Sequence, residues 1–146
     1  MITKPFACVL LAVASFAAGG AAQAAESPCV RMSEGWIRFP AMAHMAGGFG
    51  RIDNACRTDV AVTSVRSAAF KDVSLHETTL VDGVSRMREV ERLPVAAGKG
   101  VELKPGGLHL MLMDGTGSLQ EGQRVPLLLG LSDGTEVRGE LVVRRP

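Results

Sequence analysis

The chain has 146 residues, 47% hydrophobic and 21% charged, which is long enough for one domain with a substantial core. Its formal net charge is +1, and loss of the leader described below would leave 15 basic and 15 acidic side chains. This balance argues against the basic stripe of a nucleic-acid-binding protein and against a polybasic membrane-binding surface.

Residues 1–24 have the pattern of a secretory signal peptide. Lys4 is followed by an apolar run that is too short and too interrupted by glycine for a transmembrane helix, and the sequence AQA at 22–24 matches a cleavage site. Cys8 lies too early in this run to be a lipid-attachment cysteine. We therefore expect export, cleavage near Ala24 and a single soluble domain over residues 25–146.

The mature domain keeps two cysteines, Cys29 and Cys56. In an oxidising compartment an even pair most often forms a structural disulfide, and the export signal favours this interpretation. The alternative is a pair of metal-binding or redox thiols, although the two cysteines form no C-x-x-C motif.

Short segments in which apolar and polar residues alternate fill the rest of the chain, which predicts β-strands. In chain order the expected strands are residues 35–39, 47–53, 60–67, 73–79, 84–90, 101–104, 107–113, 124–131 and 136–144. The expected turns are Asp82-Gly83, Ala97-Gly98, Pro105-Gly106, Asp114-Gly115 and Asp133-Gly134. No window has a convincing helical face, so the pattern predicts an all-β antiparallel sandwich or barrel.

Alternation along three of these strands places His or Met on the face where polar residues are expected. In residues 107–113 the leucines claim the core face, which turns His109 and Met111 away from it. By the same argument His76 points away from the core in its strand, and Met87 shares its face with polar neighbours.

The four candidate ligands are therefore His76, Met87, His109 and Met111. Imidazole nitrogen and thioether sulfur are neutral donors, and thioether is soft, so the set suits Cu(I) better than zinc, calcium or magnesium. Taken singly, each has a plainer explanation, a methionine as core filler and a histidine as a surface or hydrogen-bonded residue. Their shared placement on outward faces favours a metal site.

The spacing of the four residues, H-x10-M-x21-H-x-M, resembles the copper-binding signature of the periplasmic copper chaperone family PCuAC. The surroundings are similar too, with LHET around His76, RMREV around Met87, and VELKPGGLHLMLM leading to His109 and Met111. The similarity covers roughly residues 35–144, which is nearly the whole expected domain.

The resemblance implies a cupredoxin-like antiparallel β-sandwich that binds one Cu(I) per chain through His76, Met87, His109 and Met111. It also implies a periplasmic chaperone that supplies copper for the CuA or CuB centre of cytochrome c oxidase. The expected partners are a copper-accepting oxidase subunit, a Sco-type thiol-disulfide protein, or both. We expect a monomer, with no nucleic-acid partner and no membrane insertion.

Some members of that family hold a second copper in a His- and Met-rich tail, whereas this sequence stops at Pro146, so that second site is not expected here. Met42, His44 and Met45 cluster soft donors elsewhere, but a loop with incidental methionines is the simpler interpretation. Met113 shares the face of Met111, and we expect it to be a neighbour of the site and not a ligand.

Three other residues near these strands have structural interpretations. Trp36 begins an expected strand and is expected to be a core or edge anchor. Arg86 and Arg88 flank Met87, and a solvated strand face is the default, with a partner-docking patch as the alternative.

Two other functions compete with copper carriage. An electron-transfer cupredoxin needs a cysteine close before a histidine and a methionine, and neither Cys29 nor Cys56 has such neighbours. A non-metal periplasmic interaction module would make the His and Met residues incidental. An enzyme is not expected, since no nucleophile elbow or His-Asp-Ser grouping occurs.

Overall fold

The structure, a computed structural model, describes residues 20–38 and 44–145. Within these ranges the chain forms ten β-strands and no helix, and hence no helix capable of crossing a bilayer. The strands are β1 (Val30–Arg38), β2 (Met45–Asn54), β3 (Val60–Arg66), β4 (Phe70–Val81), β5 (Val84–Glu89), β6 (Leu93–Val95), β7 (Gly100–Leu103), β8 (Leu108–Gly115), β9 (Arg124–Leu131) and β10 (Glu136–Arg144).

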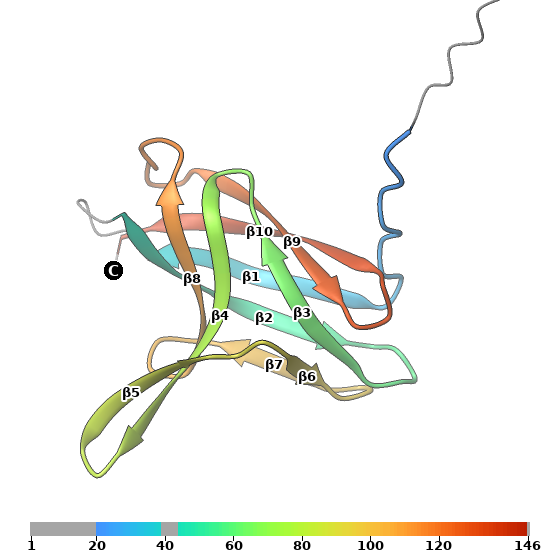
Figure 1. Cartoon of the computed structure of the whole chain (residues 1–146), viewed down its shortest axis with the longest axis horizontal. Coiled ribbons are helices and arrows are strands. Elements are labelled where there is room, and N and C mark those ends of the chain that lie inside the picture. Colours follow the sequence, from blue (N-terminus) through green and yellow to red (C-terminus); the bar gives the residue numbers. More distant parts are fainter. Residues whose placement is uncertain (1–19, 39–43, 146) are drawn as a thin grey trace, which may run out of the picture.

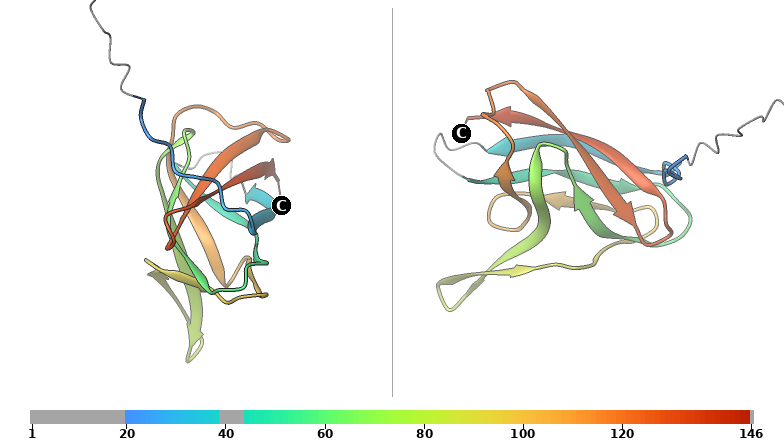
Figure 2. Two further views of the ribbon diagram at one scale, coloured as in Figure 1. Left: turned by 90° about the vertical axis from the view of Figure 1, so that its right-hand side faces the viewer. Right: turned by 45° about the horizontal axis from the view of Figure 1, so that its top comes forward.

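All ten strands belong to one sheet that folds over on itself into two layers. The strand order is β5-β4-β8-β2-β1-β10-β9-β3-β6, and β7 pairs with β2. In Figure 1, β4 and β8 cross in front of β1 and β10, and the two further views in Figure 2 show the same layering. The layering brings β3 and β4 into contact although they are distant in the strand order.

Aliphatic side chains fill the space between the layers, as strand alternation predicts. Removing each from water contributes about 1.5–3 kcal/mol to folding. The largest that are fully buried are Ile37, Ile52, Leu110, Leu112, Leu127, Leu129 and Leu141. The expected all-β sandwich is confirmed.

One strand is absent from the sequence-based expectation, and the largest difference in a boundary is at the start of β1. β6 is not among the expected strands because it has only three residues and contains Pro94, a residue that usually marks a break. β1 begins at Val30 and not at residue 35, because a register shift between Ser33 and Trp36 interrupts its alternation.

The sheet is mixed, although the pattern predicts antiparallel pairing throughout. β1 and β10 run parallel, with Trp36 opposite Val142, and this pairing joins segments from the two ends of the chain without any hairpin signal.

The turn expected at Asp114-Gly115 is also wrong, because these residues complete β8. The Asp114 amide donates to the His44 carbonyl at 2.8 Å and so extends the pairing with β2.

The β4–β5 hairpin and the disulfide agree with expectation. Asp82 and Gly83, with φ values of 50° and 75°, form the tight turn of a hairpin that extends away from the body of the sheet (Figure 1). Cys29 and Cys56 are disulfide-bonded, with 5.1 Å between their Cα atoms, and join the start of β1 to the end of β2.

Candidate metal centre

His76 and His109 face each other across β4 and β8. The register pairs them directly, and directly opposite residues of an antiparallel pair point to the same face. Their ring centroids are 6.0 Å apart, and the ring planes differ by 29°. Since metal–nitrogen bonds are about 2 Å long, one ion between the rings is within bonding reach of a nitrogen from each.

Both methionines are diagonal neighbours of His76. Met111 on β8 lies opposite Ser74, and Met87 on β5 lies opposite Thr78. Ser74 and Thr78 flank His76 at two-residue spacing and share its face. Diagonal residues lie about 7–8 Å apart, which long side chains can span. The register thus brings all four predicted ligands to one face of β5, β4 and β8.

His109 lies on the predicted face but is buried there, with only 8% of its surface exposed. The ring of Phe49, whose centroid is 6.5 Å away, lies beside it. Nδ1 of His109 is 2.9 Å from the Gly107 carbonyl oxygen, which can only accept, so Nδ1 donates and Nε2 keeps its lone pair. A metal-binding histidine held in this way is oriented before the ion arrives.

Exposure increases from His109 towards the hairpin. His76 and Met111 are half-buried, whereas Met87 is 54% exposed. Nε2 of His76 lies 3.0 Å from Ser74 Oγ, and when it donates to this hydroxyl, Nδ1 presents the free lone pair. The arrangement therefore has a covered side at His109 and an open side at Met87.

The donor set suits a soft monovalent ion. Among the described residues no group of three or more His, Cys, Asp or Glu side chains is arranged to hold a metal. Cys29 and Cys56 are bonded to each other, so neither offers a thiolate. The exposed Glu89 lies opposite His76 and places one carboxylate on the same face. The four predicted ligands on this face are two imidazoles and two thioethers, which together favour Cu(I).

Aromatic rings continue from His109 across the sheet. The Phe49 and Trp36 centroids are 4.5 Å apart, and the guanidinium carbons of Arg38 and Arg144 lie 5.8 Å and 5.9 Å from the Trp36 ring centroid. Trp36 is thus an aromatic anchor on this face, separated from His109 by Phe49, which agrees with the structural interpretation of this residue.

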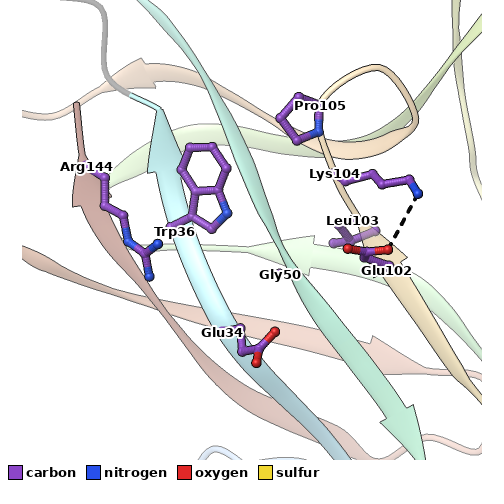
Figure 3. Close-up of a pocket in the computed structure, with 8 residues that line it drawn as sticks. All are labelled: Glu34, Trp36, Gly50, Glu102, Leu103, Lys104, Pro105 and Arg144. Carbon is purple, nitrogen blue, oxygen red and sulfur yellow. Dashed lines mark ion pairs between the residues drawn. The ribbon is translucent and has the colours of Figure 1, made fainter. Parts of the chain in front are cut away.

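A cavity of about 470 Å³ lies beside Trp36. Figure 3 shows Trp36 and Arg144 on one side of it and Glu102 and Lys104, which form a 3.5 Å ion pair, on the other. None of the four predicted ligands lines this cavity. The candidate centre is therefore separate from this cavity.

Three supporting residues were not among the predicted site residues. Ser74 shares the parity of His76, so the alternation held a signal for it. Gly107 acts through its backbone carbonyl, for which a sequence has no side-chain signal. Phe49 reaches His109 from β2, and only the pairing of distant strands reveals that contact.

The arginines beside Met87 lie on the opposite face of β5, as alternation requires. Arg86 and Arg88 are exposed, and Arg88 pairs with Glu77 at 2.5 Å, so a solvated strand face describes them.

His44 is exposed next to β2, while Met42 lies outside the described residues. The cluster expected around His44 is therefore only partly described.

Comparison with known proteins gives the family of this chain. A family model described as "Putative lipoprotein LpqE-like" matches residues 30–143. The chain belongs to the LpqE-like family. "Putative lipoprotein Lxx21020" of Leifsonia xyli subsp. xyli (strain CTCB07) is 34% identical over 109 residues, which is 73% of this chain. The match spans 64% of that relative's length.

Solved structures similar to this LpqE-like protein include PCuAC domains. The apo PCuAC domain from PmoF1 has a TM-score of 0.70 at 19% identity, covering 85% of this chain and 100% of that domain. The copper-bound PCuAC domain from PmoF2 has a TM-score of 0.68 at 19% identity, and the match covers 86% of this chain and 100% of that domain. Cu(I)-bound DR1885 from Deinococcus radiodurans has a TM-score of 0.64 at 22% identity, and the match covers 88% of this chain and 85% of that protein. These similarities confirm the cupredoxin-like fold implied by the family resemblance.

Proposed function

We propose that this LpqE-like protein is an exported carrier that binds one Cu(I) through His76, Met87, His109 and Met111. The observation that carries the proposal is the β5-β4-β8 register, which brings the imidazole of His109 and the thioethers of Met87 and Met111 beside His76 on one face. The copper in the PmoF2 domain and the Cu(I) in DR1885 support the proposal, because these proteins share the fold.

The ligand set is appropriate for a protein that releases its ion. Neutral donors leave the positive charge of the ion uncompensated, so an acceptor with thiolates, which are soft and anionic, binds it more strongly. Met87 is the most exposed of the four ligands, so an acceptor can replace it first. We assign no enzymatic step to the site, since transfer of Cu(I) changes neither its oxidation state nor any covalent bond.

The proposed destination is the CuA or CuB centre of cytochrome c oxidase. The proposed partners are the copper-accepting oxidase subunit and a Sco-type thiol-disulfide protein. The proposed carrier is a monomer, because copper can leave it through the open side of the site at Met87.

The Cys29–Cys56 disulfide supports the proposed location in the periplasm, because disulfides persist in oxidising compartments. The family and its Leifsonia relative are both described as lipoproteins, which agrees with export. Cys29 is committed to the disulfide and is not free for lipid attachment. Residues 1–19 of the expected signal peptide lie outside the described residues.

Anaerobic titration of residues 25–146 with Cu(I), against a competing chelator, tests the proposal. One equivalent should bind per chain. Met87→Ala combined with Met111→Ala should weaken Cu(I) binding at least about 100-fold. Removing a group that only supports a metal ligand already costs up to about 100-fold in affinity, and this variant removes two ligands. Unchanged Cu(I) affinity in this variant would show that the four-residue site is wrong.

Met32→Leu is the matched control. Met32 packs against the hydrophobic core, so replacing its sulfur should leave Cu(I) affinity unchanged. Circular dichroism should show that all variants stay folded. An intense blue absorption with Cu(II) would instead favour an electron-transfer cupredoxin.

A further inference from the structure

The face that carries the four ligands continues past Met111 to two further methionines. Met113 follows Met111 by two residues on β8 and shares its face. Met45 on β2 lies directly opposite Met113. Met45 is 46% exposed and Met113 is half-buried, so solvent reaches this pair.

The core does not explain these two side chains. Leu112, between Met111 and Met113, points into the core and is fully buried, and its partner Ala46 on β2 is buried as well. Met45 and Met113 point to the opposite face, where two large apolar side chains gain little from burial. The pair therefore stands apart from the methionines that fill cores.

Pair geometry allows both sulfurs to reach one ion. Side chains directly opposite in an antiparallel pair have Cβ atoms about 4.5–5.5 Å apart, and methionine has three rotatable bonds beyond its Cα atom. Asp72 on β4 lies opposite Met113 on its other side and adds an exposed carboxylate nearby. This charge favours the presence of a cation without replacing the soft donors.

The pair also adjoins the four-residue site. Met111 lies opposite Gly47, which makes it the diagonal neighbour of Met45. Gly47 has no side chain to separate the two, and a Cβ atom there would come within 3.1 Å of the Phe49 ring. Met111, Met113 and Met45 thus form a continuous set of thioethers leading away from His109.

We propose that Met45 and Met113 form a second, weaker Cu(I) site from which the ion passes to and from the four-residue site through Met111. The transfer part of the proposal rests on the proposed function. Two thioethers without an imidazole bind Cu(I) more weakly than the four-residue set, because they supply fewer donors. Ligand exchange between neighbouring neutral sulfurs needs no electron or proton, so the ion moves as Cu(I) throughout.

Methionine methyl NMR of residues 25–146, labelled with ¹³C, tests the site with Cu(I) as the probe. The first equivalent should shift the methyl signals of Met87 and Met111. The second should shift those of Met45 and Met113, with an affinity at least about tenfold lower. Met32, packed against the core, provides an internal reference that should not move.

The decisive variant is Met45→Leu combined with Met113→Leu, which conserves volume and removes only the sulfurs. It should lose the second binding event, keep the affinity for the first equivalent and load several-fold more slowly from a Cu(I)–chelator complex. Leu80→Ala is the matched control, because Leu80 is 75% exposed on the same face but has no sulfur. It should leave both binding events and the loading rate unchanged.

The outcomes separate this proposal from the proposed function. A normal first equivalent, with Met45 and Met113 unshifted and loading unchanged in the double leucine variant, would overturn the second site alone. Loss of the first equivalent with the Met45 and Met113 signals still shifting would refute the four-residue carrier and the transfer path, and would support only the methionine pair as a Cu(I) site.

Discussion

At the residue scale, the hydrogen bond between His109 and Gly107 decides which ring nitrogen is free for a metal. The carbonyl of Gly107 accepts from Nδ1, so the lone pair lies on Nε2. Since the ring is buried and beside Phe49, it has little freedom to turn. The orientation of this ligand is therefore set by the backbone of its own strand.

We expect His109 to be the Nδ1–H tautomer in the metal-free protein at a pH where its ring is neutral. Long-range ¹H–¹⁵N correlation spectra report the tautomer directly, and the exposed His44 serves as a reference ring. A spectrum with the proton of His109 on Nε2 would contradict the assignment of Nε2 as the metal-binding atom.

Single-residue alternation predicts the faces of β8 correctly. The leucines at 110 and 112 are fully buried, while Met111 and Met113 lie on the other face. It does not predict the burial of His109, because the covering ring of Phe49 comes from another strand. Alternation along a strand predicts the face to which each side chain points. Whether that side chain is buried depends also on which strands become neighbours.

At the element scale, the β4–β5 hairpin, whose β5 contains Met87, extends away from the body of the sheet (Figures 1 and 2). Every residue of β5 is exposed, so the hairpin is stabilised mainly by its turn and by pairing with β4. Its geometry therefore affects the metal site more than the stability of the core.

We expect Gly83→Ala to weaken Cu(I) binding up to about 30-fold, because a left-handed conformation costs a non-glycine residue roughly 1–2 kcal/mol. Gly83 has a φ of 75° in the hairpin turn, and Gly134 has a φ of 84° in the β9–β10 turn. Chelator competition measures the affinity, and urea unfolding measures global stability.

Gly134→Ala is the matched control for the turn. It introduces similar strain at a site remote from the ligands, and neither glycine has atoms close enough to clash with an added Cβ. It should lower stability and leave Cu(I) affinity unchanged. Equal effects of the two variants on Cu(I) affinity would show that hairpin geometry does not control the site.

An element is predicted well where turn residues and alternation coincide. The Asp82-Gly83 hairpin carries both signals and is confirmed. β6 carries neither, since Pro94 occupies the middle of three residues, and its place is fixed by pairing with β3. The early start of β1 is hidden by the register shift after Ser33.

At the scale of the whole molecule, the disulfide and the ligand face use opposite ends of β2. Cys56 follows the end of β2 and binds Cys29, whereas β8 pairs with the beginning of β2, Met45–Gly48. The two features therefore contribute to different properties, the disulfide to stability and the ligand face to binding.

We expect Cys29→Ser combined with Cys56→Ser to lower the free energy of unfolding by about 2–4 kcal/mol, chiefly by releasing a constraint on the unfolded chain. Urea unfolding measures the loss, and the reduced wild-type protein should behave alike. Cu(I) affinity of the folded variant should not change. A large loss of affinity would instead indicate that the cysteines contribute to the metal site.

Long-range pairing is the part of the molecule that the sequence pattern leaves undetermined. The parallel pairing of β1 and β10 joins chain ends that share no turn signal. Spacing and family resemblance predict that ligands from β4, β5 and β8 group together, and the register provides the geometric basis for this grouping. Local patterns specify strands, but the relative placement of strands depends on the whole chain.

The position of β5 at one end of the strand order has a consequence for aggregation. Because β5 is an edge strand, a copper acceptor can approach it, but other chains can also pair with its free edge. Arg86, Arg88 and Glu89 are charged and exposed along β5, and charges of this kind disfavour edge-to-edge association. At the opposite end of the order, the short β6 contains Pro94. Both ends of the sheet are thus protected from polymerisation, and on β5 the thioether of Met87 remains accessible.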